Sequence, residues 1–308
     1  MSLLPICRAS LVVLGALLAH TATLPAQERG HHHAATSSSS SSSSIALPDR
    51  ARRQIHELHE AVTPLSDTDA ATDAGFFPVL GWIPSMGTHW VNMERMEDGF
   101  DRLKPDHLMF SPIDGELKLV GAAYAFRGAR RAKLPDAFAG SLDRWHDHPW
   151  LAPEGETIHM LHVWFVDSPD GPFAGHNPWL PFWAVGLTPP DESRMRDPAT
   201  ARRIRALGSA LSTTVEPGTT DLILQRVAGD GVLQDVERHR MVIRDLVPGL
   251  KRAQAKGDLA EWDRLAERGA REWEAIRGRY LAAAPTPRAR AIVAELLEQI
   301  TGEGGGHH

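Results

Sequence analysis

The sequence predicts an α+β fold in which an antiparallel β-sheet unit with long loops is followed by a helical C-terminal part. Two changes along the chain lead to this prediction. All nine phenylalanines and seven of the nine tryptophans lie between Phe76 and about Pro190, among many prolines. Beyond Pro190 no phenylalanine occurs, and apolar residues recur at steps of three and four. This is the period of amphipathic helices.

Composition indicates a globular protein and excludes several classes of partner. The chain has 308 residues, of which 42% are hydrophobic and 23% are charged, which is typical of a domain with a full hydrophobic core. Lys and Arg number 33 against 39 Asp and Glu, so the net charge is -6. No basic field exists to hold a phosphate backbone, and nucleic acid is excluded as an expected partner.

The first 26 residues have the layout of a secretory signal peptide. Arg8 precedes an apolar run from Leu11 to Ala19, and small residues follow. The run is too short to cross about 30 Å of hydrocarbon. Cys7 lies before the run, where it does not suit lipid attachment, and it is the only cysteine. We therefore expect an exported, soluble, periplasmic or extracellular protein that has no stable membrane anchor after cleavage and no internal disulfide.

Composition also predicts the division of the chain. The predicted segments are a signal peptide (1–26), a disordered His- and Ser-rich linker (27–47), a leading helix with a Trp- and His-rich β unit (48–190), a helical part packed on it (191–302) and a disordered tail (303–308). The linker holds three consecutive histidines, His31–His33, and the serine tract Ser37–Ser44. Polar low-complexity sequence of this kind cannot bury enough apolar surface to offset its ordering entropy.

Periodicity and turn residues place the expected elements. An amphipathic helix is expected from Pro48 to Val62. The expected strands are a hairpin of His107–Ser111 and Leu117–Phe126 around Asp114-Gly115, a strand Ile158–Val166, and two weaker candidates, Trp82–Asn92 and Phe182–Leu187. The expected helices are Asp197–Leu211, a stripe from Val232 to Leu250 kinked or broken by Pro248, Asp258–Ala283, and Arg288–Ile300.

Particular residues within the helical part have expected roles. Asp197 is the predicted N-cap of its helix, because Pro198 suits the first helical position. Trp262 and Trp273 are eleven residues apart, which places both on one inward face of their helix. His239 lies on an apolar stripe and is interpreted as a hydrogen-bonded core histidine.

Two histidine motifs are weighed against known metal sites. In His56-Glu57-Leu58-His59 the histidines stand at i and i+3, whereas the metalloprotease helix needs i and i+4, so a solvated helix face is the better interpretation. His146-Asp147-His148 would project both imidazoles from one face of a strand. With Gly140 and Glu154 this segment resembles the first metal motif of the cupin barrels.

The cupin resemblance is partial. The glutamate comes late, the segment continues as Pro149-Trp150, and no second cupin motif follows. An exposed, proline-capped loop is therefore the favoured interpretation. His159 and His162 are three residues apart on one predicted strand and are expected on opposite faces, with His162 beside Met160 and Trp164.

A second resemblance rests on three segments in order. They are Met86-Gly87-Thr88-His89-Trp90-Val91-Asn92, Leu119-Val120-Gly121-Ala122-Ala123-Tyr124, and Leu161-His162-Val163-Trp164 followed by Asn177-Pro178. This pattern resembles a group of exported bacterial proteins of unknown function with Met-Gly-x-His-Tyr-Val, Leu-Val-Gly-x-Glu-Tyr and Leu-His-x-Trp motifs before an Asn-Pro turn. It covers roughly Phe76–Trp183.

The resemblance implies that His89 and His162 are the recurring imidazoles. The chain departs from the group at Ala123, where the group tends to have a glutamate, and near Phe182-Trp183, where the group has a cysteine. His176, just before the Asn-Pro turn, offers a replacement ligand.

Three functions remain open at this stage. The leading hypothesis is a binding module whose Trp-lined pocket holds a small molecule, or a metal ion through His89, His162 and His176; zinc, copper and iron are the candidate ions. The second is a metal-dependent enzyme that uses Asp147, Glu154 or Asp167 as proton carrier. The third is a structural protein whose histidines belong to the core. His107 is expected in an outer strand, away from any site. The oligomeric state is left undetermined.

Overall fold

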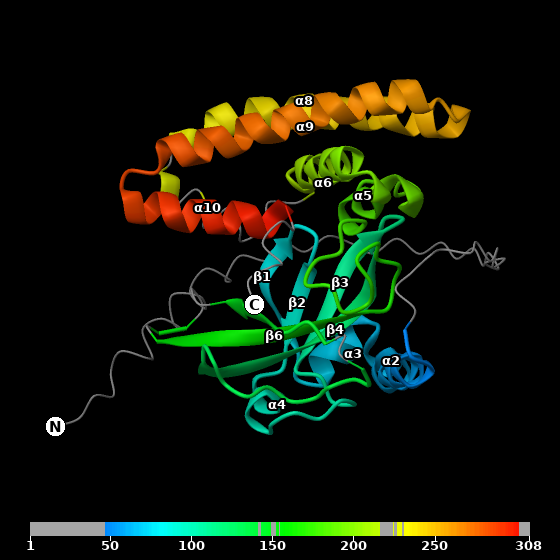
Figure 1. Ribbon diagram of the computed structural model, residues 1–308, viewed down its shortest axis with the longest axis vertical. Coiled ribbons are helices and arrows are strands. Elements are labelled where there is room, and N and C mark those ends of the chain that lie inside the picture. Colours follow the sequence, from blue (N-terminus) through cyan, green and yellow to red (C-terminus); the bar gives the residue numbers. More distant parts are fainter. Residues whose placement is uncertain are drawn as a thin grey trace. The chain divides into compact units, whose positions relative to one another are not determined.

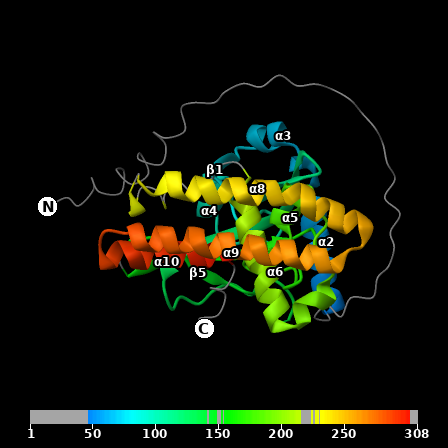
Figure 2. The ribbon, with the colours of Figure 1, turned by 90° about the horizontal axis from the view of Figure 1, so that it is seen from above.

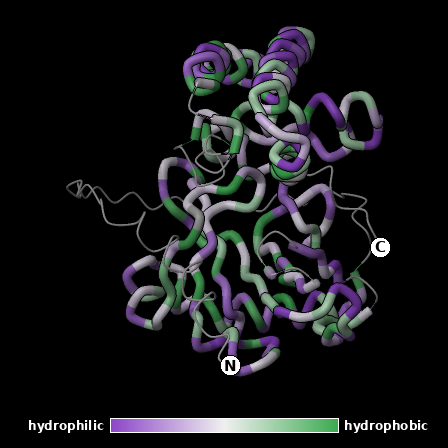
Figure 3. Tube along the Cα trace, turned by 90° about the vertical axis from the view of Figure 1, so that its left-hand side faces the viewer, coloured by the Kyte–Doolittle hydropathy of each residue, from purple (hydrophilic) through white to green (hydrophobic). Residues whose placement is uncertain are grey.

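The computed structural model describes residues 47–301, apart from 141–142, 149–151, 154, 216–223, 225–226 and 230. The predicted signal peptide, residues 27–46 of the predicted linker and the predicted tail lie outside the described residues, as does Glu154. None of the helices in the described ranges combines the length and apolar character needed to cross a membrane. The hydropathy colouring of Figure 3 shows polar and apolar residues mixed along the elements.

The predicted α+β class is confirmed, with the strands in the N-terminal half and most of the helix in the C-terminal part (Figure 1). The N-terminal half contains α2 (Asp49–Val62), η1 (Thr63–Leu65), α3 (Thr68–Asp73), β1 (Phe77–Ile83), β2 (Gly87–Val91), α4 (Met93–Glu97), β3 (His107–Ile113), β4 (Glu116–Ala129), β5 (His146–His148) and β6 (Glu156–Trp164). The C-terminal part contains α5 (Leu180–Ala184), η3 (Glu192–Arg196), α6 (Pro198–Ser212), α8 (Val232–Lys256), α9 (Leu259–Ala283) and α10 (Pro287–Thr301).

The described strands form one six-stranded sheet in the order β1-β2-β3-β4-β6-β5, and every neighbouring pair is antiparallel. The predicted hairpin is present as β3 and β4. Its turn places Asp114 and Gly115 at φ values of 54° and 82°, the left-handed conformation that a tight hairpin turn requires. The predicted strand Ile158–Val166 is also present, as β6.

Two of the weaker strand predictions need correction. The segment Trp82–Asn92 is not one strand, because Ser85 and Gly87 adopt positive φ and turn the chain between β1 and β2. A Cβ atom at Gly87 would lie 2.5 Å from the carbonyl oxygen of Phe110, so glycine is required there. The segment Phe182–Leu187 is not a strand. Its first residues belong to the short helix α5, which has a proline in its first turn.

The two faces of the sheet are covered by different apolar clusters. One face buries Leu108, Leu161 and Val163 together with Leu58 of α2. The opposite face buries Met109, Ala123, Met160 and Trp164, with Leu180 of α5 packed against it. Because side chains alternate along a strand, residues with the parity of Met160 and Ala123 belong to this second face.

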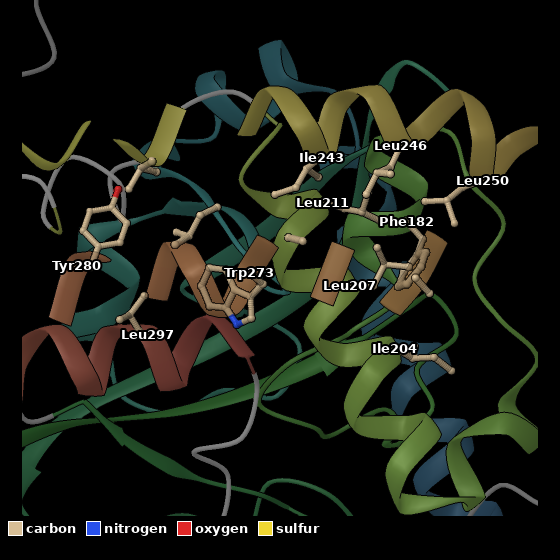
Figure 4. Packing of buried hydrophobic residues seen from close by; sticks show 14 of the residues in the cluster. Phe182, Ile204, Leu207, Leu211, Ile243, Leu246, Leu250, Trp273, Tyr280 and Leu297 are labelled. Atoms are coloured by element: carbon tan, nitrogen blue, oxygen red, sulfur yellow. The ribbon is translucent and has the colours of Figure 1, made fainter. Parts of the chain in front are cut away.

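The C-terminal helices share a core of their own. Figure 4 shows side chains of α6, α8, α9 and α10 meeting in this cluster, and α8 and α9 run side by side in Figures 1 and 2. Pro248 lies inside one continuous helix, so the predicted break is wrong. Leu246 and Leu250 flank Pro248 and are both buried in the cluster, and this burial offsets the loss of one backbone hydrogen bond.

The predicted N-cap and the two inward tryptophans are confirmed, and His239 is hydrogen-bonded as predicted but only partly buried. The Asp197 carboxylate accepts a hydrogen bond from the Thr200 amide at 2.8 Å, as expected of an N-cap. His239 on α8 forms a contact of 2.7 Å between its Nδ1 and Oε2 of Glu272 on α9. Trp262 and Trp273 are both buried, with 3% and 1% of their surface exposed.

Truncating Trp273 to alanine is expected to lower the free energy of unfolding by about 3–5 kcal/mol, because a large buried side chain is replaced by a cavity. Urea denaturation gives the value. Leu259→Ala is the control on the same helix, since Leu259 is 64% exposed, and it should change stability by no more than about 0.5 kcal/mol. Equal effects from the two variants would contradict the assigned inward face.

Candidate histidine site

Five histidines from four strands project from one face of the sheet. They are His89, His107, His146, His148 and His162, and we call them the histidine cluster. The register explains their common side. His107 lies opposite Ala123, and Ala123 lies opposite His162. His146 pairs with Met160, two residues from His162. Val91 lies opposite His107, and His89 is two residues from Val91, so strand alternation gives it the same side.

The imidazoles of the cluster are close enough to contact one another. The Nε2 atoms of His89 and His162 are 3.3 Å apart, and the centroids of these rings are 5.3 Å apart. His107 lies 6.0 Å from His89 between ring centroids. His146 lies 4.8 Å from His162 and 4.9 Å from His148. The cluster is therefore one continuous group of rings.

Three of the rings are held at Nδ1 by oxygen acceptors. His162 Nδ1 donates to the carbonyl of Gly175 at 2.7 Å, and His146 Nδ1 contacts the carbonyl of Arg144 at 3.4 Å. His107 Nδ1 bonds the carboxylate of Asp106, whose oxygens also accept from the Ala125 amide at 3.1 Å. In each ring Nε2 remains for another partner. Metal-binding histidines are oriented in this way by carbonyl or carboxylate acceptors.

The proton positions of His89 and His162 leave one buried lone pair without a donor. The carbonyl of Gly175 can only accept, so the His162 proton lies on Nδ1 and its Nε2 carries a lone pair. If His89 is protonated on Nε2, its Nδ1 is a buried acceptor, and that atom has no hydrogen-bond partner. If His89 is protonated on Nδ1 instead, the two Nε2 lone pairs face each other at 3.3 Å. Neither neutral tautomer satisfies both rings.

Protonation does not resolve this conflict, because burial holds the rings neutral. Burial, followed by the neighbouring His107 and His146, lowers the pKa of His89 to about 3, against a smaller raising effect of the Gly87 backbone. Burial, followed by the charges of neighbouring histidines, also holds the pKa values of His148 and His162 well below their usual range. Burial lowers the pKa of His146. At neutral pH these four imidazoles are therefore uncharged, and each has one nitrogen with a lone pair.

Of the sequence-predicted site residues, the structure brings His89 and His162 together. His176 follows Gly175, whose carbonyl holds His162, and it acts electrostatically on His148. Ligation by all three predicted residues stays a prediction.

Two expectations about other histidines are wrong. His107 does not lie in an outer strand, because β3 is paired on both sides, with β2 and β4. The segment containing His146 and His148 is not an exposed loop but the edge strand β5, and His148 is buried. Their i, i+2 spacing was the signal that favoured a strand.

Of the residues expected to carry protons, Asp147 lies away from the cluster. The Asp147 carboxylate contacts Nδ1 of His159 at 2.6 Å. That ring also reaches the Ala129 carbonyl at 3.0 Å, and it lies on the face opposite His162, as predicted from their spacing. The backbone carbonyl of Asp167 accepts a hydrogen bond from the side chain of Asn177. The carboxylate beside the cluster is instead Asp106, which sequence reasoning missed.

The described residues contain no group of three or more His, Cys, Asp or Glu side chains already arranged to hold a metal ion. A cavity of about 30 Å³ lies beside Asp106, with Phe100, Tyr124 and Trp145 also in its wall and no histidine of the cluster among its lining residues. Trp145 is the one tryptophan among its lining residues, and the cavity has room for about two water molecules. Asp106 therefore both lines this cavity and bonds His107.

No known protein family matches the chain, and no curated protein or solved structure matches it either. The resemblance to the exported bacterial proteins stays a prediction.

The buried imidazoles predict an acid-sensitive protein. Their pKa values are lower in the folded chain than the ordinary value of 6.5, so the unfolded chain takes up protons first as the pH falls. Stability is therefore full above about pH 6.5 and is lost below it, continuing down to about pH 3 for His89. The expected slope is about 1.4 kcal/mol per pH unit for each such imidazole.

Urea denaturation in metal-free buffer at pH 7.5, 6 and 5 measures this slope. The His89→Gln variant is the matched control and should show a shallower slope, because it removes one titrating group. Stability that is constant or higher at pH 5 would contradict the assignment of neutral buried rings.

Proposed function

We propose that this protein binds a divalent metal ion of the zinc or copper class, and that His89 and His162 are its central ligands, with His107 as the third. The proposed function is metal binding by histidine side chains that project from the sheet. It keeps two of the three ligands expected from the sequence, His89 and His162, and replaces His176 by His107.

The observation that supports the proposal most directly is the 3.3 Å separation of the His89 and His162 Nε2 atoms. Zinc-nitrogen bonds are about 2.0–2.1 Å long, so two nitrogens on one tetrahedral ion are about 3.3–3.4 Å apart. The same distance is long for a hydrogen bond between two nitrogens. A cation between the rings would also bind the lone pairs of both Nε2 atoms, so that neither lone pair faces the other without a partner.

His107 is the favoured third ligand because its other nitrogen is already fixed. Asp106 bonds Nδ1, so the carboxylate orients the ring and leaves Nε2 as the ligating atom. Bringing His107 to the pair requires a side-chain rotation. Such an adjustment costs about 0.5–1.5 kcal/mol, whereas a structural zinc site contributes about 10–16 kcal/mol. The ion can therefore impose the final arrangement.

The donor set indicates the class of ion. The neighbouring side chains that can ligate are imidazoles, and the single cysteine of the chain is Cys7. Imidazole donors suit zinc, copper, nickel and iron rather than magnesium or calcium, and affinity rises toward Cu²⁺ along the divalent series. Ala123, where the resembled proteins tend to have a glutamate, lies in the register between His107 and His162. The small side chain of Ala123 leaves the space between His107 and His162 open to the imidazoles.

Replacing His162 by glutamine is expected to weaken Zn²⁺ binding at least about 100-fold, because one of two central ligands is lost. Isothermal titration with ZnCl₂ measures the affinity. The background is the full chain with the five tail histidines, His31–His33 and His307-His308, changed to alanine, so that the tails do not contribute. His239→Gln is the control, since His239 bonds Glu272 between two helices. Equal affinities in the two variants would reject the site.

Replacing Asp106 by asparagine is expected to weaken Zn²⁺ binding by about 10- to 100-fold without abolishing it, because the carboxylate orients a ligand and does not bind the ion. The same titration measures this effect, and His107→Gln should be at least as damaging. Unchanged affinity in Asp106→Asn, with affinity lost in His107→Gln, would show that Asp106 has only a structural role.

A further inference from the structure

We infer that the cavity beside Asp106 is a binding site for a small primary alkylammonium ion. The ammonium group lies among aromatic rings and bonds the Asp106 carboxylate, and the alkyl chain leads out past Phe100 and Phe126. This inference goes beyond the proposed metal binding, because it concerns a different ligand and a cavity whose lining residues include none of the cluster histidines.

Aromatic rings form much of the cavity wall. Four aromatic residues are among those that line it: Phe100, Tyr124, Phe126 and Trp145. The ring centroids of Phe100 and Tyr124 are 5.0 Å apart, and those of Phe100 and Trp145 are 6.3 Å apart. Three rings from separate segments of the chain therefore meet here. A cation within about 6 Å of a ring centroid is attracted to the face of the ring, and cages of such rings recognise organic ammonium groups.

Asp106 places a carboxylate in the same wall. Its side chain is 9% exposed. Both of its oxygens accept from the Ala125 amide, and Oδ1 also bonds Nδ1 of His107. A carboxylate has about four lone-pair sites, so these bonds leave acceptor capacity on Oδ2. An ammonium group can therefore bond Asp106 without displacing His107.

The size of the cavity limits the group that can enter it. A volume of about 30 Å³ has room for about two water molecules, which matches the two non-hydrogen atoms of a terminal CH₂–NH₃⁺ group. A trimethylammonium group is twice as large by this measure. Phe100 and Phe126 are 36% and 42% exposed, so the wall reaches the surface, where the rest of an alkyl chain can lie. The cavity therefore favours a primary amine.

A lysine of the chain also lines the cavity, but its charge is paired elsewhere. The Nζ atom of Lys104 lies 3.7 Å from Oδ2 of Asp101, and the Lys104 side chain is 71% exposed. Its ammonium group is therefore solvated, and salt screens its repulsion of a cation in the cavity.

The experiment titrates three ligands of similar size into the full chain in metal-free buffer at pH 7.5. The probes are n-butylammonium, 1-butanol and butyrate. The readout is the ¹⁵N-indole NMR signal of Trp145, whose Nε1 is buried without a hydrogen-bond partner, and the signal is assigned by its loss in Trp145→Phe. We expect n-butylammonium to bind with a dissociation constant of about 1–10 mM, because so few atoms supply little binding energy. The alcohol and the anion should bind at least about 10-fold more weakly.

Two variants test the assigned contacts. Asp106→Asn should weaken n-butylammonium binding at least about 10-fold, because the carboxylate charge is lost. Phe100→Leu should weaken it at least about 3-fold, because an alkyl side chain does not attract a cation as a ring does. Leu103→Ala is the matched control and should bind as the parent does, since Leu103 is 42% exposed in the same segment and is not among the lining residues.

Each outcome decides the inference. No saturable shift with n-butylammonium overturns it, as does equal or tighter binding of 1-butanol or butyrate. Parent affinity in Phe100→Leu overturns the assignment of the rings, and this exposed position keeps the test open if Asp106→Asn does not fold. Because the buffer contains no metal, a failure of this site leaves the proposed metal site intact, and a failure of the metal site does not alter the result.

Discussion

The constraint on which this structure depends is the burial of neutral imidazoles against one another with too few hydrogen-bond donors between them. The carbonyl that fixes the His162 proton leaves its Nε2 facing that of His89 at 3.3 Å. A buried acceptor without a donor costs about 1–3 kcal/mol. That cost is a sizeable part of the 5–15 kcal/mol that stabilises a typical domain. A cation between the two Nε2 atoms would bind both facing lone pairs, which is how the burial of the rings bears on the proposed metal site.

The sheet produces this constraint through its register. The antiparallel pairing places His107, Ala123 and His162 in one row, and the small side chain of Ala123 leaves room between the two rings. Gly121 lies on the same strand, and a Cβ atom there would meet the Met109 side chain at 2.5 Å and the Val163 carbonyl at 2.6 Å. A shift of one residue in any strand would turn its histidines to the opposite face. The strand register therefore fixes the face from which the histidines of the cluster project.

Local signals in the sequence were sufficient for most elements and for part of the site. The Asp114-Gly115 turn, the Asp197 cap and the apolar stripes of α8 and α9 act over a few residues, so their predictions were confirmed. Pairing between distant strands is not a local property. It brings His107 from a segment expected at the edge into the centre of the sheet, and it makes a strand of His146–His148 although prolines follow. The helix α5 was missed because its apolar residues suit a buried strand equally well.

Burial also bears on the kind of metal site proposed for the cluster, a closed site or one with an open coordination position. His162 is fully buried, and His89 and His107 are 4% and 7% exposed. A catalytic ion needs an open coordination position that substrate can reach, and none of these histidines is among the residues that line the cavity beside Asp106. The Asp106 carboxylate in the wall of this cavity bonds His107. Within the proposed site, the burial of these three rings therefore favours a closed set of protein ligands.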